Sequence, residues 1–332
     1  MIKLADIAKK TGYSINTVSH ALNDKNDIAP ATKEYICSVA KEMGYVRNYS
    51  ASSLRSGKTH SIAIIIGDIS NPLFAIEVKE IEQKLRNQGY NAFILNTDED
   101  EEIEREAILS AMSKCVDGIL ICPTQKSTAN IELLKQKNIP FVLFGRYFEN
   151  IDSDYVVCDD ENGGFVAAEH LLKLGHRNIL FINTYSYISS SKLRLEGIKR
   201  AYKEYGVDES KLRVSEIGAL SGKDVIEEIV QSNSDCSAII CFSDFFALTV
   251  AHVCNKMGKK IPEDVSIMGF DDIASKMHFP LALTSVTSAK TKMTHHAVDA
   301  LLRLINKSKE KCQIVLPTKI VQRDSTSKYN KE

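Results

Sequence analysis

The stretch TGYSINTVSHALN, residues 11–23, decides the fold of the amino-terminal part of the chain. Gly12 is placed to end one helix, and Ser14 is placed to cap the next by accepting a hydrogen bond from a backbone N–H. The helix that follows has an apolar inner face formed by Val18, Ala21 and Leu22. Its outer face carries short hydrogen-bonding side chains where a solvated helix usually carries Lys and Glu. This pattern indicates a surface that contacts another molecule.

Amphipathic helices are predicted on both sides of this stretch. In LADIAKKTG, residues 4–12, the apolar side chains of Leu4, Ile7 and Ala8 recur at helical spacing. The segment ATKEYICSVAKEMGY, residues 31–45, follows Pro30 as a third helix. We expect it to bury Tyr35, Ile36, Val39, Ala40 and Met43. Three helices in about 45 residues, the first two joined by a tight glycine turn, predict a helix-turn-helix.

The second helix of this motif has the side chains that a DNA-reading helix needs. Asn16 can pair with adenine through two hydrogen bonds, and Ile15 can pack on a thymine methyl group. The first sixty residues contain nine Lys and Arg but only five Asp and Glu, although the formal net charge of the whole chain is −1. A basic front on an acidic body indicates an anionic partner for the front alone. The expected DNA-contacting residues of this head are Ser14, Ile15, Asn16, Thr17, Ser19, His20, Asn23 and Tyr45.

Length and composition indicate a soluble protein of two or three domains. The chain has 332 residues, of which 44% are apolar and 26% are charged. Its eight cysteines form no CxxC pair, and most lie in apolar runs such as GILIC, where cysteine packs as a small hydrophobic residue. The sequence contains neither the apolar segment of a signal peptide nor a membrane-spanning run. We therefore expect a reduced, cytoplasmic protein.

From Ser61 onward, apolar runs alternate with amphipathic segments. SIAIIIG, YNAFILNT, GILICP and FVLFG predict strands separated by helices, and NILFIN, RVSEI, SAIICFS and VSIMGF predict a second set. Continuous runs of Val, Ile, Leu and Phe are typical of parallel strands that are covered on both faces. The sequence therefore predicts two similar α/β lobes. No GxGxxG follows a strand, so a dinucleotide-binding fingerprint is absent.

Polar side chains follow several of these strands. In open parallel sheets, ligands bind beyond the carboxyl ends of the strands, and the gap between two lobes is a natural cleft. Carboxylates, an amide and a guanidinium beside an aromatic ring suit a polyhydroxylated ligand, because each hydroxyl needs donors and acceptors. The residues in such places are Asp68, Asn71, Phe74, Arg146, Asp244 and Asp271. Capping of the following helices is the alternative function for Asp68 and Asp244.

A series of motifs extends over nearly the whole chain: MIKLADIAKKTGYSINTVSHALN, GYVRNYSASSLRSGKT, NPLF, GHRNILFI, RLEGI, VSIMGFDDIA and QRDS. In these motifs the chain resembles the lactose- and galactose-repressor family of transcription regulators. The resemblance implies an all-α helix-turn-helix head and an α/β periplasmic-binding-protein-like core of two doubly wound parallel-sheet lobes. It also implies a homodimer on pseudo-palindromic duplex DNA, controlled by a small-molecule effector between the lobes. That effector is expected to be a sugar or sugar derivative.

The same resemblance implies domain boundaries and a hinge. The expected domains are a head (1–46), a hinge (47–60), an N-terminal lobe (61–161 and 292–319) and a C-terminal lobe (162–291 and 320–332). In NYSASSLRSGK, residues 48–58, the family forms a hinge helix on operator DNA, with Leu54 as a wedge in the minor groove and Asn48, Ala51 and Arg55 beside it. A passive flexible linker is the alternative.

The resemblance places the effector against Asn71, Phe74, Arg146, Arg194, Ser243, Asp244 and Asp271. The chain departs from the family at four positions. His20 stands where many members carry an arginine that reads guanine, and Arg47 stands where proline is frequent. Ser243 stands where asparagine is common, and Ile217 stands where several members carry an aromatic ring. For Arg194, which lies inside a predicted helix, a surface salt bridge is the alternative.

Two other classes of protein share parts of this pattern. A sugar-binding receptor of a transport system has two such lobes, but it needs a signal peptide and lacks residues 1–58. An enzyme needs a nucleophile, a base or a metal set. SGKT (56–59) lacks the earlier glycine of a phosphate-binding loop, SSSK (189–192) lacks its companion SDN and KTG motifs, and the adjacent His295 and His296 face different directions. We therefore expect no enzymatic activity, cofactor or metal.

Overall fold

The computed structural model describes residues 2–45, 58–218, 221–278 and 280–329. The chain divides into two compact units, Met1–Thr59 and His60–Glu332. The hinge residues expected to contact DNA, which are Asn48, Ala51, Leu54 and Arg55, lie outside the described residues. No helix in the described ranges has both the length and the apolar character that crossing a membrane requires.

The amino-terminal unit contains the three predicted helices, α1 (Leu4–Thr11), α2 (Ile15–Leu22) and α3 (Pro30–Glu42). Gly12 ends α1 with a φ of 77°, and the Ser14 hydroxyl caps α2 by accepting a hydrogen bond from the Thr17 N–H at 3.1 Å. The three helices bury a common core of Ile7, Ala8, Val18, Ala21, Ile36 and Ala40. These observations confirm the predicted motif.

One core prediction for this unit is wrong. Tyr35 is 48% exposed and lies edge-on to Tyr13, with ring centroids 6.5 Å apart. The adjacent Ile36 takes the buried position instead. Successive residues of a helix are separated by about 100°, so Tyr35 points about a quarter of a turn away from the buried Ile36 and toward solvent.

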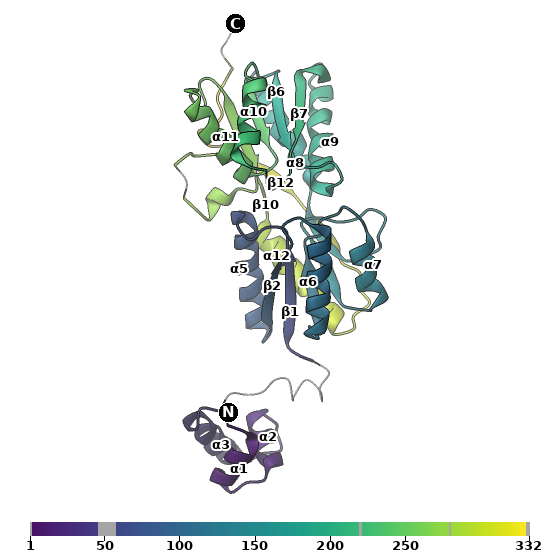
Figure 1. Cartoon of the computed structure of the whole chain (residues 1–332), viewed down its shortest axis with the longest axis vertical. Helices are drawn as coiled ribbons and strands as arrows, with labels where there is room; N and C mark the ends of the chain where they lie inside the picture. The colour runs from purple at the N-terminus through teal and green to yellow at the C-terminus, as the bar shows by residue number, and fades with distance from the viewer. Residues whose placement is uncertain (1, 46–57, 219–220, 279, 330–332) are drawn as a thin grey trace. The chain divides into compact units, whose positions relative to one another are not determined.

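The second unit contains two six-stranded sheets, and in the first of them every strand pair is parallel. Its order is β11-β5-β4-β3-β1-β2. The strands are β1 (Ser61–Ile66), β2 (Asn91–Asn96), β3 (Gly118–Ile121), β4 (Phe141–Phe144), β5 (Tyr155–Cys158) and β11 (Gln313–Leu316). Helices α5 (Pro72–Asn87) and α12 (Lys290–Ile305) cover one face, and α6 (Glu101–Ser113) and α7 (Ala129–Gln136) cover the other (Figure 1).

The second sheet has the order β12-β10-β9-β8-β6-β7. Its strands are β6 (Ile179–Asn183), β7 (Leu212–Glu216), β8 (Ala238–Cys241), β9 (Ser266–Phe270), β10 (Thr284–Ser288) and β12 (Thr318–Val321). Helices α8 (Asp160–Lys173) and α9 (Ser189–Glu204) pack on one face, and α10 (Lys223–Ser232) and α11 (Asp244–Lys256) pack on the other. Short 3₁₀ turns lie at η1 (Glu209–Lys211) and η2 (Ile273–Ser275).

The prediction of two α/β lobes with sheets covered on both faces is confirmed, with one departure. Strand β12 runs antiparallel to β10, whereas the other pairs of the second sheet are parallel. An antiparallel strand at the edge of a mainly parallel sheet is common. Here β12 follows β11 of the first sheet after a single residue. The chain therefore passes straight from the first sheet into the second and runs opposite to the other strands there.

Short segments join the two lobes. In the described chain they lie between β5 and α8, between β10 and α12, and between β11 and β12. Two of them are tied together by Thr318, whose hydroxyl donates to the backbone oxygen of Asp159 at 3.0 Å. The Asn162 amide donates to the Thr318 hydroxyl at 3.1 Å. Residues that follow the strands of both sheets therefore meet at the junction of the lobes.

Candidate DNA-binding surface and ligand cleft

The exposed side of α2 begins at its amino-terminal turn. Ile15 is 53% exposed, and Asn16 beside it is also exposed. The hydroxyls of Ser14 and Thr17 lie 2.9 Å apart, so the cap fixes both side chains at the start of the helix. An exposed amide can form two hydrogen bonds with adenine, and an exposed apolar side chain can pack on a thymine methyl group.

The other candidate residues of the head are less free. Ser19 is mostly buried, and its backbone oxygen and hydroxyl accept hydrogen bonds from the Asn23 amide at 2.6 and 3.3 Å. His20 Nδ1 lies 2.6 Å from a carboxylate oxygen of Asp27. Tyr45 packs against the core of the head. The structure therefore gathers Ser14, Ile15, Asn16 and Thr17 on one exposed turn, while Ser19, His20, Asn23 and Tyr45 have contacts within the head.

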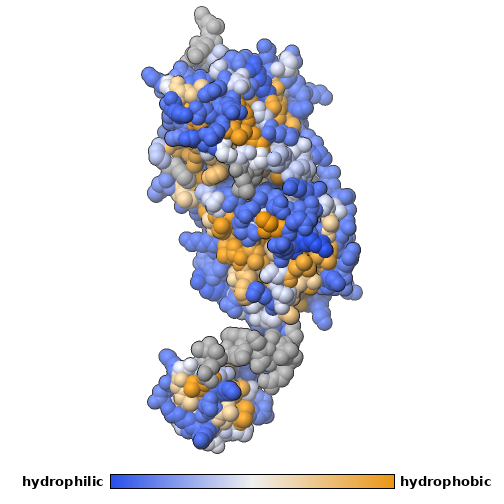
Figure 2. Space-filling view, viewed as in Figure 1, coloured by the Kyte–Doolittle hydropathy of each residue, from blue (hydrophilic) through white to orange (hydrophobic). Residues whose placement is uncertain are grey.

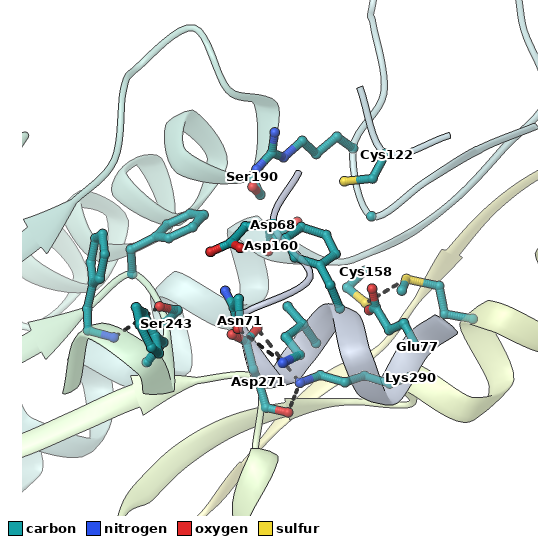
Figure 3. A pocket seen from close by; sticks show the side chains of 18 of the residues that line it. Asp68, Asn71, Glu77, Cys122, Cys158, Asp160, Ser190, Ser243, Asp271 and Lys290 are labelled. Carbon is teal, nitrogen blue, oxygen red and sulfur yellow. Dashed lines mark hydrogen bonds and ion pairs between the residues drawn. The ribbon is translucent and has the colours of Figure 1, made fainter. Parts of the chain in front are cut away.

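A cleft of about 830 Å³, its open mouth included, lies between the two lobes of the second unit (Figure 3). The sequence-predicted residues on its wall are Asp68, Asn71, Phe74, Arg146, Arg194, Ser243 and Asp271. The structure thus brings together side chains that are up to about 200 residues apart, because the ends of parallel strands meet at one edge of each sheet.

On the first lobe, three sequence-predicted residues are held by local hydrogen bonds. The Asp68 carboxylate accepts from the Ser70 N–H and hydroxyl, both at 2.8 Å, in the loop after β1. The Asn71 side chain caps α5 by accepting from the Leu73 N–H at 3.0 Å. Phe74, one turn into α5, is almost fully buried and forms part of the floor. The capping role weighed for Asp68 is wrong, since Asn71 performs it.

Arg146, after β4, is buried in a fixed orientation. Its two terminal nitrogens bind the Glu99 carboxylate at 2.7 and 2.8 Å, and one of them also donates to the backbone oxygen of Pro123 at 3.0 Å. Burial opposes the charged guanidinium, but Glu99, Cys122 and Glu104 together outweigh this effect and raise the pKa of Arg146. The guanidinium is therefore neutralised within the first lobe.

Arg194, on α9, has a similarly fixed place in the second lobe. Its Nε donates to Asp160 at 2.8 Å, its Nη1 donates to the backbone oxygen of Phe242, and the guanidinium lies 4.6 and 4.3 Å from the ring centroids of Phe242 and Phe270. Burial raises the pKa of Asp160, and Arg194 partly offsets this shift. The alternative of a surface salt bridge is wrong because the pair is buried on the cleft wall.

Ser243 and Asp244, which follow β8, have different roles. The Ser243 hydroxyl caps α11 by accepting from the Phe246 N–H at 3.2 Å. Asp244 is 0% exposed and lies behind the cleft wall, where its two oxygens accept from the Ile273 N–H at 2.9 Å and the Ser285 hydroxyl at 2.6 Å. Burial raises its pKa to about 7. The expectation that Asp244 faces the ligand is therefore corrected to a role in positioning the loop after β9, and its capping alternative is wrong.

Asp271, after β9, connects the lobes. Its backbone has a φ of 102°, which few residues other than glycine adopt. The Lys290 ammonium, at the start of α12, donates to the backbone oxygen of Asp271 and lies 3.8 Å from its carboxylate. This cation on the first lobe therefore holds the strained turn of the second lobe.

Sequence reasoning missed several residues of the wall. They are Glu77, Glu99, Asp160, Ser190, Lys290 and the aromatic rings of Phe242, Phe245 and Phe246. Asp160 is the second residue after the short strand β5, as Asp68 is the second residue after β1, so its position gave the same indication of a cleft residue. Glu77 is recognisable in a different way, because it is a charged residue within the buried, otherwise apolar face of α5. Within the described ranges no cluster of His, Cys, Asp and Glu is suited to a metal ion.

Two family models together match most of the chain. Residues 3–48 match bacterial regulatory proteins of the lacI family, and residues 59–324 match the periplasmic binding proteins and sugar-binding domain of the LacI family. The transcriptional regulator DegA of Bacillus subtilis is 34% identical over 334 residues, with 98% of both chains covered. The transcriptional repressor PurR of Glaesserella parasuis is 28% identical, covering 97% of this chain and 95% of its own.

Solved structures show the same architecture. The lac repressor dimer bound to operator and the anti-inducer ONPF has a TM-score of 0.85 at 21% identity, over 98% of this chain and 99% of that one. A LacI family regulator from Enterococcus faecium with bound ribose has a TM-score of 0.74 at 27% identity, over 81% of this chain and 100% of that one.

Proposed function

We propose, since this chain belongs to the LacI family of bacterial regulatory proteins, that its head binds a pseudo-palindromic operator and that a carbohydrate in the cleft controls this binding. The protein would act in the cytoplasm, where its DNA lies. We propose that Ser14, Ile15, Asn16 and Thr17 contact bases and phosphates at the start of α2. The remaining candidates, Ser19, His20, Asn23, Tyr45, Asn48, Ala51, Leu54 and Arg55, complete the proposed surface.

The observation that carries the proposal is the composition of the cleft wall. Hydrogen-bonding groups from both lobes converge on it, among them Asp68, Asn71 and Arg146 from one and Arg194, Ser243 and Asp271 from the other. Phenylalanine rings stand beside them, which suits the mixed polar and apolar faces of a sugar. The relative from Enterococcus faecium binds ribose in the same fold.

Contacts across the cleft give the ligand a way to act at a distance. The Gln125 side chain accepts a hydrogen bond from the Ser189 N–H at 2.9 Å, and Lys276 pairs with Glu80 at 3.2 Å. A ligand that touches both walls changes the free energy of such contacts. It therefore favours one angle between the lobes, provided that its affinity differs between the two states. We propose that this angle sets the operator affinity of the head.

We propose that the head ends at residue 46 and the hinge at residue 60, and that the chain crosses from one lobe to the other near residues 161, 291 and 319.

We further propose that the protein forms a homodimer. On β2, which is an edge strand, Phe93 and Ile94 are exposed, and on α6 Ile103 and Leu109 are exposed. Figure 2 shows hydrophobic side chains gathered on this face of the first lobe. An exposed apolar edge strand favours pairing with a second copy.

Operator binding is tested by letting the full-length protein select DNA from a pool of random duplexes. The enriched duplexes are then titrated in gel shifts. We expect enrichment of a two-fold-related sequence and an affinity that falls steeply with salt, since phosphate contacts release counterions. A thermal-shift screen against sugars would then identify the ligand. Equal binding of selected and scrambled duplexes would contradict the proposal.

A further inference from the structure

Glu77 occupies a position where the helix pattern calls for an apolar side chain. Helix α5 buries Phe74, Val78, Ile81 and Leu85 against the first sheet, and Glu77 lies on the same face with only 4% of its surface exposed. A carboxyl group on the buried stripe of an amphipathic helix destabilises the fold unless something compensates it. Its side chain lines the cleft (Figure 3).

This carboxyl has no direct partner in the described part of the chain. It forms no hydrogen bond or ion pair with a described residue, and its neighbours on the floor include Cys122, Cys158 and Met293. Burial raises the pKa of Glu77 to about 8, against a smaller opposing effect of Lys290 and Arg146 and a supporting one of Asp271. The Cys122 thiol stays protonated as well, because burial raises its pKa to about 12.

The cations around the cleft are already engaged. Arg146 is neutralised by Glu99, Arg194 by Asp160, and the Lys290 ammonium by the carbonyl and carboxylate of Asp271. The carboxyls of Asp68 and Glu77 line the same cleft without a cationic partner among the described residues. The Asp68 carboxylate therefore leaves the cleft with an excess of negative charge, and Glu77 adds to it whenever it is ionised. This excess disfavours an anionic ligand such as a sugar phosphate or sugar acid.

We propose that the ligand of this cleft is a polyhydroxylated molecule that carries a basic amine, and that the Glu77 carboxylate binds its ammonium group. The inference rests on the proposed function and specifies the chemical class of the effector. No covalent bond changes: the ligand keeps its ammonium protons, and Glu77 releases its own proton to the solvent. A hydrogen bond between two charged groups in a desolvated site is among the stronger polar contacts.

The experiment compares matched ligands on the full-length protein by isothermal titration calorimetry. Glucosamine, galactosamine and mannosamine are each compared with the sugar that has a hydroxyl in place of the amine. We expect at least one amine to bind about tenfold or more tightly than its neutral counterpart. Titrations at pH 7 in two buffers of different ionisation heat should show net release of protons, because burial keeps Glu77 mostly protonated before the ligand binds.

Three variants identify the residue responsible. Glu77→Gln keeps the size of the side chain, and Glu77→Leu restores the apolar face of α5, so at least one of them folds. Both should lose the preference for the amine and the proton release. Glu82→Gln, on the exposed side of the same helix, should retain both, because Glu82 pairs only loosely with Arg86 at 3.7 Å.

Three results would overturn the inference: neutral sugars binding as tightly as every amine, amine binding without proton release, or an unchanged preference in the Glu77 variants. A panel without any binding amine has the same meaning. The operator gel shift on the same samples separates this failure from failure of the proposed function. If a neutral sugar changes operator affinity, the proposed function stands and only the inference that the ligand carries an amine is wrong. Loss of sequence-specific DNA binding would refute the proposed function itself.

Discussion

Replacing Arg194 by alanine tests whether the second-lobe wall depends on a buried ion pair. The Arg194 and Asp160 side chains are 11% and 6% exposed, with their atoms 2.8 Å apart. The substitution leaves the Asp160 carboxylate buried without its partner and removes the guanidinium from between two phenylalanine rings. Breaking one side of a buried pair costs about 3–5 kcal/mol. For lobes of this size we expect a fall in melting temperature of roughly 6–20 °C.

The matched control is Arg213→Ala. Arg213 binds Asp235 through two contacts of 2.6 Å, but these side chains are 43% and 58% exposed. Because solvent screens an exposed pair, calorimetry at pH 7 should show little change in the melting temperature. Adding Asp160→Asn to the Arg194 variant should recover much of the loss, since it removes the unpaired charge. Equal melting temperatures for the two arginine variants would refute the reasoning.

Further predictions concern the head, the hinge and pH. Asn16→Ala should weaken binding to the selected operator by about 1–3 kcal/mol in gel-shift titrations and relax base preference, whereas Asn26→Ala, in an exposed turn, should not. Leu54→Ala should reduce operator affinity if the residue is a minor-groove wedge, and an unchanged affinity excludes the wedge. At low pH, Glu77 is protonated in both the folded and the unfolded chain. Between its ordinary pKa of 4.5 and its folded-state pKa of about 8, the carboxyl ionises only in the unfolded chain. The free energy of unfolding of the wild type should therefore fall by up to about 4–5 kcal/mol as pH rises through this window. The melting temperature of Glu77→Gln should therefore exceed that of the wild type by a margin that widens from pH 5 to pH 8; a constant margin would contradict the raised pKa.

Local signals explain which parts of the structure the sequence predicts well. Gly12, Ser14 and Pro30 mark helix ends through their own backbone and side-chain chemistry, and the structure places the ends there. Apolar runs give the strands because a sheet covered on both faces leaves no solvent side. Strand ends in turn predict much of the cleft wall, including Asn71, Arg146 and Asp271.

The remaining features depend on contacts between distant segments. The buried place of Asp244 is set by Ser285 and Ile273, which the sequence does not show to be neighbours. The antiparallel direction of β12 follows from its pairing with β10. Glu77 escaped notice because a single charged residue in a helix usually faces solvent, and only the burial of its neighbours on α5 reveals that it does not.

Coupling between the cleft and the head can be measured by reciprocal titration. Operator affinity is measured at zero and saturating ligand, and ligand affinity is measured at zero and saturating operator, with the full-length protein. The account predicts that both constants change by the same factor, about fivefold or more. An operator affinity that stays constant while the ligand fills the cleft would contradict it.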